Sequence, residues 1–208
     1  MTLIPIITIT SIYLFYPDKI QEPLPKMTVQ EKKARFKSLI LPVTQNVYSD
    51  LQDRYDSVSQ SIKSGSGDKY EDLKKEYKAS NDEELLMALK PHPISITLAQ
   101  AAMESSWATS RFFREANNIF GVWSFDEDEP RIAAGEKRGN KTIWVKKYSS
   151  IKKAIQDYYR TLARGSAYNE FRALNLETND PHELVKKLDH YSEKGAKYGE
   201  ELSSIISY

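Results

Sequence analysis

One acidic residue stands out because of the residues around it. Glu104 is the one ionisable side chain between Ser95 and Arg111, near the end of a stretch of small and apolar residues that Trp107 follows. Burial raises the pKa of a carboxyl group, and a glutamic acid that stays protonated near neutral pH can donate a proton to the leaving oxygen of a glycosidic bond. A buried carboxylate satisfied by a partner charge such as Arg111 or Arg114 is the alternative, and the sequence context leaves both open.

Amides and aromatic rings follow this glutamate closely. The run from Asn117 to Trp123 contains two amides, a glycine and two large rings. Amides hydrogen-bond to sugar hydroxyl and acetamido groups, and aromatic rings stack on pyranose faces. The run therefore indicates a carbohydrate site with Asn118, Phe120, Gly121 and Trp123 as candidate substrate contacts. The alternative is an asparagine turn that ends a helix and leads into a core strand.

The order of these residues resembles the signature of a bacterial enzyme family. The runs that carry the resemblance are Ala99–Trp107, Thr109–Phe112 and Asn117–Gly121. They resemble the endo-β-N-acetylglucosaminidases of glycoside hydrolase family 73, which cut peptidoglycan, and most of all their Bax-type branch. The similarity extends from about Thr28 to the C-terminus. It implies a lysozyme-like fold, Glu104 as the proton donor on a helix beside a sugar-binding cleft, and a β-hairpin as the opposite wall.

The chain departs from the family pattern at two places. Ala108 stands where the family usually has glycine, and an acidic insert occupies residues 126–129 of the hairpin region. The second departure matters because the family's second carboxylate lies in this hairpin. The candidates for that carboxylate are Glu127, Asp128, Glu129 and Glu136.

We favour Glu136 as the second catalytic carboxylate. It precedes the Gly139-Asn140 turn, where a flexible hairpin could swing it over the cleft. A surface ion pair with the basic residues around Glu136 is the alternative. If no carboxylate is close, the acetamido group of the substrate could take the role, as in some glycosidases.

Two tyrosines near the C-terminus complete the candidate site. Tyr191 and Tyr198 are seven residues apart, which places them on one face of a helix unless Gly195 breaks it. The resemblance implies that Tyr191 lines the cleft near the reacting sugar; a core tyrosine with a satisfied hydroxyl is the alternative. We include Trp107 and Tyr198 with it as substrate contacts.

Composition excludes several other chemistries. The 208 residues include 30 basic and 29 acidic ones, so the net charge of +1 offers no general attraction to nucleic acid. The absence of cysteine excludes thiolate nucleophiles and cysteine-ligated metals. The three histidines show no metal-binding spacing, and His92, between prolines, is expected in a loop. We therefore expect no cofactor, no metal and no nucleic-acid partner.

The hydrophobic periodicity predicts the elements that position these residues. A long amphipathic helix is expected from the Thr28 capping box to about residue 62, with Pro42 kinking or splitting it. Further helices are expected over 70–77, 81–89, 95–107, 151–162 and 180–188, and in a last piece that ends at residue 206. Strands are expected over 120–125 and 142–145, and Trp144, Tyr158 and Tyr159 in the core. The predicted fold class is mainly α (α+β), a lysozyme-like helical domain with a small β-hairpin lobe.

The N-terminus is expected to target or anchor the protein. Residues 3–16 carry no charge and match the apolar region of a signal sequence in length, although no basic residue precedes them and no A-x-A cleavage pattern follows. A β-branched first strand is the alternative. The expected organisation is a targeting or anchor segment over 1–17, a proline-containing linker over 18–27 and a glucosaminidase domain over 28–208. Within the domain we expect N-terminal helices over 28–90 and the catalytic core over 95–208.

The sequence thus predicts a peptidoglycan hydrolase of the cell envelope, periplasmic or secreted. It would act as a monomer on the β-1,4 bond of glycan strands that contain N-acetylglucosamine, with possible membrane association through the N-terminal segment. A lytic transglycosylase and a non-catalytic wall-binding module are the alternatives, and a purely structural helical protein would require an ion-paired Glu104 and no groove.

Overall fold

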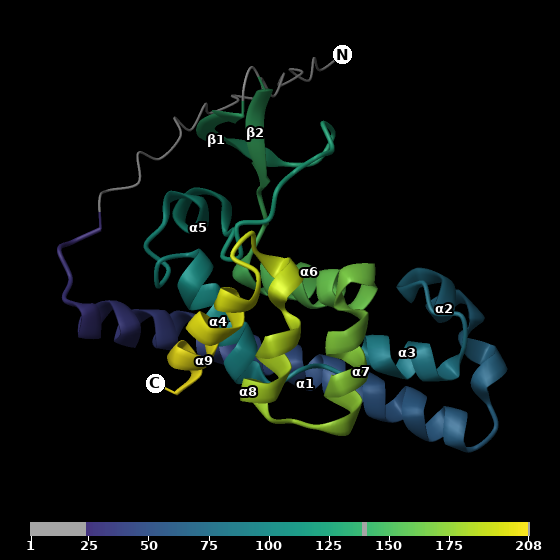
Figure 1. Cartoon of the computed structure of the whole chain (residues 1–208). Coiled ribbons are helices and arrows are strands. Elements are labelled where there is room, and N and C mark those ends of the chain that lie inside the picture. The colour runs from purple at the N-terminus through teal and green to yellow at the C-terminus, as the bar shows by residue number, and fades with distance from the viewer. Residues whose placement is uncertain (1–23, 139–140, 208) are drawn as a thin grey trace, which may run out of the picture.

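The computed structural model of the chain describes residues 24–138 and 141–207, except for the side chains of 67, 68, 136–138 and 141 (Figure 1). Within these ranges the chain is a helical assembly with one small hairpin at its edge. Its α-helices are α1 (Val29–Lys63), α2 (Glu71–Tyr77), α3 (Asp82–Leu89), α4 (Ile94–Glu104), α5 (Arg111–Ala116), α6 (Ile151–Arg164), α7 (Asn169–Glu177), α8 (Pro181–Leu184) and α9 (Ala196–Ile206). The short 3₁₀ helices are η1 (Gly67–Tyr70), η2 (Ser166–Tyr168), η3 (Val185–Lys187) and η4 (Asp189–Tyr191), and the strands are β1 (Arg131–Arg138) and β2 (Lys141–Lys146).

Helix α1 begins at the predicted capping box. The Thr28 hydroxyl accepts from the Glu31 amide at 3.2 Å, and the Glu31 carboxylate accepts from the Thr28 amide at 2.7 Å. The helix continues through Pro42 to Lys63, so the prediction that this proline splits it is wrong. A proline inside a helix removes one backbone hydrogen bond. The buried face of α1 on both sides of the proline, which includes Ile40 and Val47, offsets that loss.

Helix α4 lies in the centre of the main core (Figure 1). It packs against α1 on one side and against α9 on another. Its alanines, Ala99, Ala101 and Ala102, are almost completely buried, and their small side chains let the neighbouring helices approach closely. Tyr158 and Tyr159 of α6 are buried in the same core, as predicted.

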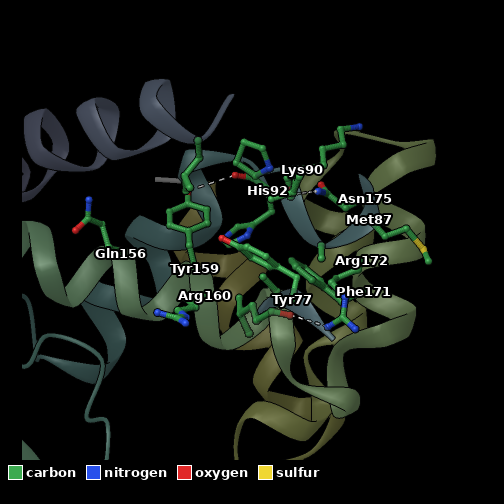
Figure 2. Close-up of a pocket in the computed structure, with 16 residues that line it drawn as sticks. Tyr77, Met87, Lys90, His92, Gln156, Tyr159, Arg160, Phe171, Arg172 and Asn175 are labelled. Atoms are coloured by element: carbon green, nitrogen blue, oxygen red, sulfur yellow. Dashed lines mark hydrogen bonds between the residues drawn. The ribbon is translucent and has the colours of Figure 1, made fainter. Parts of the chain in front are cut away.

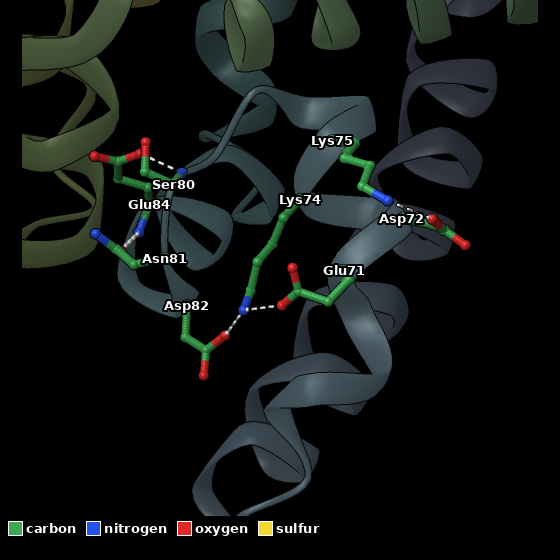
Figure 3. Close-up of polar contacts among 8 residues, drawn as sticks. All are labelled: Glu71, Asp72, Lys74, Lys75, Ser80, Asn81, Asp82 and Glu84. Carbon is green, nitrogen blue, oxygen red and sulfur yellow. Dashed lines mark hydrogen bonds and ion pairs between the residues drawn. The ribbon is translucent and has the colours of Figure 1, made fainter.

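A second, smaller core joins the far end of α1 to α2 and α3. It consists of Val58, Tyr77, Leu85, Ala88 and Leu89. Figure 3 shows the polar contacts that close this lobe: the Lys74 ammonium lies 2.8 Å from Glu71 and 2.7 Å from Asp82, which links α2 to α3. The Asn81 side chain caps α3 by accepting from the Glu84 amide at 2.8 Å.

The hairpin is antiparallel, and its register pairs Ile132 with Val145 and Ala133 with Trp144. A register shift between Ala133 and Lys137 bulges β1, and Gly135 there has φ of 85°. The predicted strand over 142–145 is confirmed within β2, but the one predicted over 120–125 is wrong. That segment forms a loop with a single bridge from Trp123 to Val145, and β1 lies beyond the acidic insert.

The predicted fold class, mainly helical with a small β-hairpin, is confirmed. Helix α7 occupies a stretch for which no helix was predicted. Trp144 was expected in the core, but it is only partly buried, and the Arg131 guanidinium lies 4.6 Å from its ring centroid. Across 24–138 and 141–207, no helix has both the length and the apolar character that crossing a bilayer requires. The predicted targeting segment over 1–17 lies outside the described residues.

Candidate functional site

Glu104 is the last residue of α4, and the structure places it half-buried where α4 meets α9. Its Oε1 accepts a hydrogen bond from the Tyr198 hydroxyl at 2.9 Å. Burial raises the pKa of Glu104, and the Tyr198 hydrogen bond and the charge of Lys194 oppose this shift only in part. The partial negative charge at a helix C-terminus also disfavours a carboxylate there. This carboxyl therefore holds its proton to higher pH than an exposed glutamic acid does.

An arginine ion pair was the alternative interpretation of Glu104. Arg111 instead forms an ion pair with Glu115 at 2.9 Å and donates to the Ala133 carbonyl at 2.6 Å. The Tyr198 hydroxyl, which carries no charge, donates the hydrogen bond to the Glu104 carboxyl. Arg111 is thus engaged with other partners, and Lys194 is a cation whose charge acts on Glu104.

The turn after Glu104 has a left-handed backbone over three residues, none of them glycine. The φ values of Ser106, Trp107 and Ala108 are 52°, 61° and 58°. Each such residue costs roughly 1 kcal/mol. Two hydrogen bonds stabilise the turn: the Ser105 hydroxyl accepts from the Ala108 amide at 2.8 Å, and Arg35 of α1 donates to the Ala108 carbonyl at 3.0 Å. The left-handed backbone at Ala108 is one that glycine would adopt without steric cost.

Trp107 packs against α1 and away from Glu104. Its ring meets Phe36 edge-on at 5.4 Å, and the Lys33 ammonium lies 5.0 Å from the ring centroid. It lines a groove with Leu98 and Ala102, and Ala102 lies about 200° around α4 from Glu104. Substrate binding by Trp107 is untested, and in this structure its side chain holds the helix end in place.

The two C-terminal tyrosines lie together beside Glu104. The rings of Tyr191 and Tyr198 stack at 5.4 Å with an angle of 14° between their planes. They do not share one helix, because Tyr191 ends η4 and Tyr198 lies in α9, after Gly195 with φ of 56°. Tyr198 is buried, whereas Tyr191 is partly exposed. Tyr191 can therefore meet a ligand directly, and Tyr198 reaches it only through Glu104 and Tyr191.

Gly199 explains how α9, which carries Tyr198, comes so close to η3. A Cβ atom at this position would lie 2.7 Å from the carbonyl oxygen of Val185. Only glycine lets α9 approach the backbone of η3 at this distance. The close approach sets the position of Tyr198 and hence its hydrogen bond to Glu104.

Asn118 and Phe120 are buried, and their side chains stabilise the loop that contains them. Asn118 is 1% exposed; its amide donates to the carbonyls of Val122 and Lys146, and its oxygen accepts from the Val122 amide, each at 2.9 Å. Phe120 stacks on Tyr158 at 4.1 Å in the core. Neither side chain is open to a sugar in this conformation, so both position the backbone that follows them.

Gly121 and Trp123 lie where that loop reaches the surface. Gly121 has φ of 68°, a conformation that favours glycine. Trp123 is 39% exposed, and its ring lies 6.2 Å from that of Phe125, which is 86% exposed. Sequence reasoning missed Phe125, although a large ring at the start of an acidic loop was a signal for exposure.

The four candidate acids of the hairpin lie in different surroundings. Glu127 and Asp128 are exposed, and Glu129 lies 3.2 Å from the Lys146 ammonium. Partial burial opposes ionisation of Glu129, but hydrogen bonds from Ser124 and Lys146 outweigh it and lower its pKa. Glu136 lies on β1 next to the bulge, but its side chain is outside the described residues. The identity of the second carboxylate stays a prediction.

His92 lies in the loop between α3 and α4, as predicted, but its side chain is buried and hydrogen-bonded. It is 3% exposed, and its Nε2 lies 3.0 Å from the Tyr158 hydroxyl and 3.1 Å from that of Thr97. Complete burial lowers its pKa to about 3, so the imidazole is neutral. No local pattern signals this role, because the partners of His92 come from two different helices.

A small cavity lies behind His92, on the side away from Glu104. Figure 2 shows Tyr159, Arg172 and Asn175 among the side chains around it. Its volume of about 50 Å³ has room for a few water molecules. The buried Oδ1 of Asn175 has no partner among the described residues and suits such a water. Across the part of the chain that the structure describes, no group of three or more metal-ligating side chains occurs.

Two known proteins are similar in sequence to part of this chain. The chain is 29% identical to protein Bax of Escherichia coli over 119 residues, which are 54% of this chain and 41% of that protein. It is 36% identical to the exo-glucosaminidase LytG of Bacillus subtilis over 86 residues, 36% of this chain and 29% of that protein. The chain thus matches less than half the length of either relative.

Solved structures resemble the model at lower identity. A peptidoglycan hydrolase from Sphingomonas sp. A1 aligns at 20% identity with a TM-score of 0.48, over 59% of this chain and 82% of that one. A glycoside hydrolase domain of FlgJ from Salmonella typhimurium aligns at 23% identity with a TM-score of 0.44, over 60% and 88%.

A family model decides the assignment. The glucosaminidase model, described as mannosyl-glycoprotein endo-β-N-acetylglucosaminidase, matches residues 84–208. This range is more than half of the chain and contains α4 with Glu104, the hairpin and the two stacked tyrosines. The family resemblance seen in the sequence is confirmed: the chain belongs to the glucosaminidase family of glycoside hydrolases.

Proposed function

We propose that the chain hydrolyses the β-1,4 glycosidic bond of peptidoglycan strands that contain N-acetylglucosamine, with Glu104 as the general acid. The observation that carries this proposal is the half-buried Glu104, whose pKa burial raises and whose hydrogen-bond donor is a neutral tyrosine. It lies within the region that the glucosaminidase model matches. The name of the relative LytG, an exo-glucosaminidase, supports the same sugar.

In this proposal Glu104 protonates the leaving oxygen and makes departure of the sugar possible. Because the Tyr198 hydroxyl donates to Oε1, this proposal assigns Oε2 to the substrate. The partly exposed ring of Tyr191 and the exposed ring of Trp123 are our candidates for contact with sugar faces. Asn118, Phe120 and Gly121 contribute indirectly, because they hold the loop that presents Trp123.

Glu136 remains our candidate for the carboxylate that stabilises the developing positive charge. The bulge beside Gly135 supports this choice, because a bulge changes the direction of the following side chains. Glu129 is the weaker candidate, because its carboxylate is already engaged by Lys146. If Glu136→Gln leaves turnover unchanged and Glu129→Gln lowers it, the role moves to Glu129.

Digestion of purified peptidoglycan tests the proposal. Glu104→Gln should lower turnover at least about a hundredfold, the scale of a lost general acid. Glu115→Gln, which removes a half-exposed carboxylate that pairs with Arg111, is the matched control and should retain activity. Near-normal activity of folded Glu104→Gln would overturn the proposal.

The products separate the alternatives. Mass spectrometry should find reducing ends produced by hydrolysis. A 1,6-anhydro muramic product would identify a lytic transglycosylase, and binding without any cleavage would identify a wall-binding module.

For localisation we propose the cell envelope, because the substrate lies there. Residues 1–17 are the proposed targeting or anchor segment and the route of any membrane association. Deleting them should leave an active enzyme in vitro but prevent delivery to the envelope. A deletion variant that fails to fold would instead make this segment part of the domain. We also propose a monomer, which light scattering on the purified chain tests.

A further inference from the structure

A line of buried hydrogen bonds runs inward from Glu104. The Tyr198 hydroxyl donates to Oε1 of Glu104 at 2.9 Å, and Nε2 of Gln100 donates to the Tyr198 oxygen at 2.9 Å. Behind it, the Tyr158 hydroxyl donates to Oε1 of Gln100 at 2.5 Å. The line continues to His92, whose Nε2 lies 3.0 Å from the Tyr158 oxygen.

The number of hydrogens available gives this line one direction. Each hydroxyl carries one hydrogen: that of Tyr198 goes to Glu104, that of Tyr158 to Gln100, and that of Thr97 to Tyr159 at 2.8 Å. Nε2 of His92 faces the oxygens of Tyr158 and Thr97, so it has to be the donor. A neutral histidine with its hydrogen on Nε2 supplies this.

We propose that Gln100 and Tyr158 are positioning residues that keep the Tyr198 hydroxyl pointing at Oε1 of Glu104, and so confine the acid proton of Glu104 to Oε2. Two hydrogens cannot occupy the short gap between Tyr198 and Oε1. As long as Tyr198 is the donor there, the protonated carboxyl carries its hydrogen on the oxygen that faces the sugar. This inference rests on the proposed role of Glu104 as the general acid.

The polarity depends on which way the amide of Gln100 faces. A reversed amide would offer its oxygen to Tyr198 and turn that hydroxyl away from Glu104, whose Oε1 could then carry the proton and donate it to Tyr198. His92 prevents the reversal: because the Thr97 hydrogen goes to Tyr159, Nε2 has to donate and cannot accept from Tyr158, whose hydrogen therefore requires the amide oxygen of Gln100. Gln100 is 0% exposed, so no bulk water substitutes for either contact.

Three substitutions break the line at successive points: Tyr198→Phe, Gln100→Leu and Tyr158→Phe. Each favours the neutral carboxyl, either by removing the donor to the carboxylate or by letting Glu104 donate to Tyr198. The pKa of Glu104 should therefore rise in all three. In Gln100→Leu and Tyr158→Phe, kcat at pH values below the pKa of Glu104 should fall about three- to tenfold, which is the scale of one hydrogen bond, and KM should stay unchanged.

Titration of the Glu104 carboxyl by ¹³C NMR gives a readout that does not need activity, and Glu104→Gln identifies its signal. The charged and titratable groups that act on this carboxyl are Tyr191, Lys194 and Tyr198. Of these groups only Tyr198 is altered, and only in Tyr198→Phe. A shift in the pKa of Glu104 in Gln100→Leu or Tyr158→Phe therefore reports the hydrogen-bonded line behind Tyr198. Tyr77→Phe is the matched control, since that buried hydroxyl accepts from Arg54 in the smaller core.

The outcomes separate the two proposals. An unchanged Glu104 titration and pH profile in Gln100→Leu and Tyr158→Phe would overturn the positioning role, whatever the activity of Glu104→Gln. Full activity of Glu104→Gln would overturn the catalytic proposal, while the titration would still report the direction of the hydrogen bonds. If Gln100→Leu fails to fold, the isosteric Tyr158→Phe and Tyr198→Phe keep the test open.

Discussion

Replacing Ile40 by alanine tests whether α1 belongs to the folded core of the glucosaminidase domain. The family model matches residues 84–208, and α1 lies before that range. Ile40 is nevertheless 0% exposed and packs in the same core as α4, α6 and α9. We therefore expect loss of this side chain to destabilise the entire domain.

The expected cost follows from the atoms removed. Ile40→Ala deletes three carbon atoms, about 2.4 kcal/mol of burial at roughly 0.8 kcal/mol each. The cavity left behind brings the expected total to about 3 kcal/mol, within the range of about 2–5 kcal/mol for such changes. For a domain of this size that loss lowers the melting temperature by roughly 6–12 °C.

Urea denaturation followed by circular dichroism measures the change in the free energy of unfolding. Leu39→Ala is the matched control: the Leu39 side chain is 38% exposed, and its loss should cost less than about 1 kcal/mol. Equal costs for the two substitutions would refute the packing described here. A second transition in Ile40→Ala alone would show that α1 unfolds separately from the matched region.

Three further predictions concern the site and its supports. Burial raises the pKa of Glu104, so this group stabilises the fold below the ordinary carboxyl pKa and loses that contribution as pH rises through its folded value. The free energy of unfolding of Glu104→Gln, measured by urea denaturation, should therefore increase relative to that of the wild type as pH rises from about 4 to 7.5. A difference that instead grows toward low pH would contradict this. Gly199→Ala should destabilise the protein by about 1–3 kcal/mol and lower turnover, because the new methyl group meets the Val185 carbonyl oxygen. Thermal melts with Ser204→Ala as the exposed control on α9 measure this, and a more stable Gly199→Ala would disprove the close approach. Asn118→Leu should cost at least about 2 kcal/mol, because the Val122 amide and the Lys146 carbonyl lose the Asn118 side chain as a partner, and the Val122 carbonyl keeps only the Lys146 amide. Denaturation measures that cost, and an unchanged midpoint would show that the loop does not depend on this amide.

The central helix and its glutamate could be predicted from the sequence for a local reason. Small residues all round a helix indicate burial, and one acid among them is conspicuous. The predicted end at Trp107 was too late, because Ser105 accepts from the Ala108 amide in a left-handed turn without glycine. Non-glycine residues give no local signal for that backbone.

The direct contacts of the site could be predicted only in part. That Tyr191 and Tyr198 lie together was expected from their spacing, but they stack across a turn rather than along one helix. Burial of Asn118 depends on carbonyls 4 and 28 residues away, and spacing alone cannot reveal the second contact. The hydrogen-bonded line from Glu104 to His92 joins three helices, so no sequence window contains it.

The length and place of α1 have a consequence for how the chain folds during synthesis. Its apolar face is covered mainly by α3, α4 and α6. About 100 residues separate Lys63 from Arg164 at the end of α6, and at roughly 5–20 residues per second the ribosome needs about 5–20 s to add them. Until then the hydrophobic stripe of this 35-residue helix lacks at least one of its three main native partners, although α3 and α4 are made before α6. The nascent chain is therefore a natural client for chaperones that hold apolar segments, and its central core closes only when most of the chain has been made.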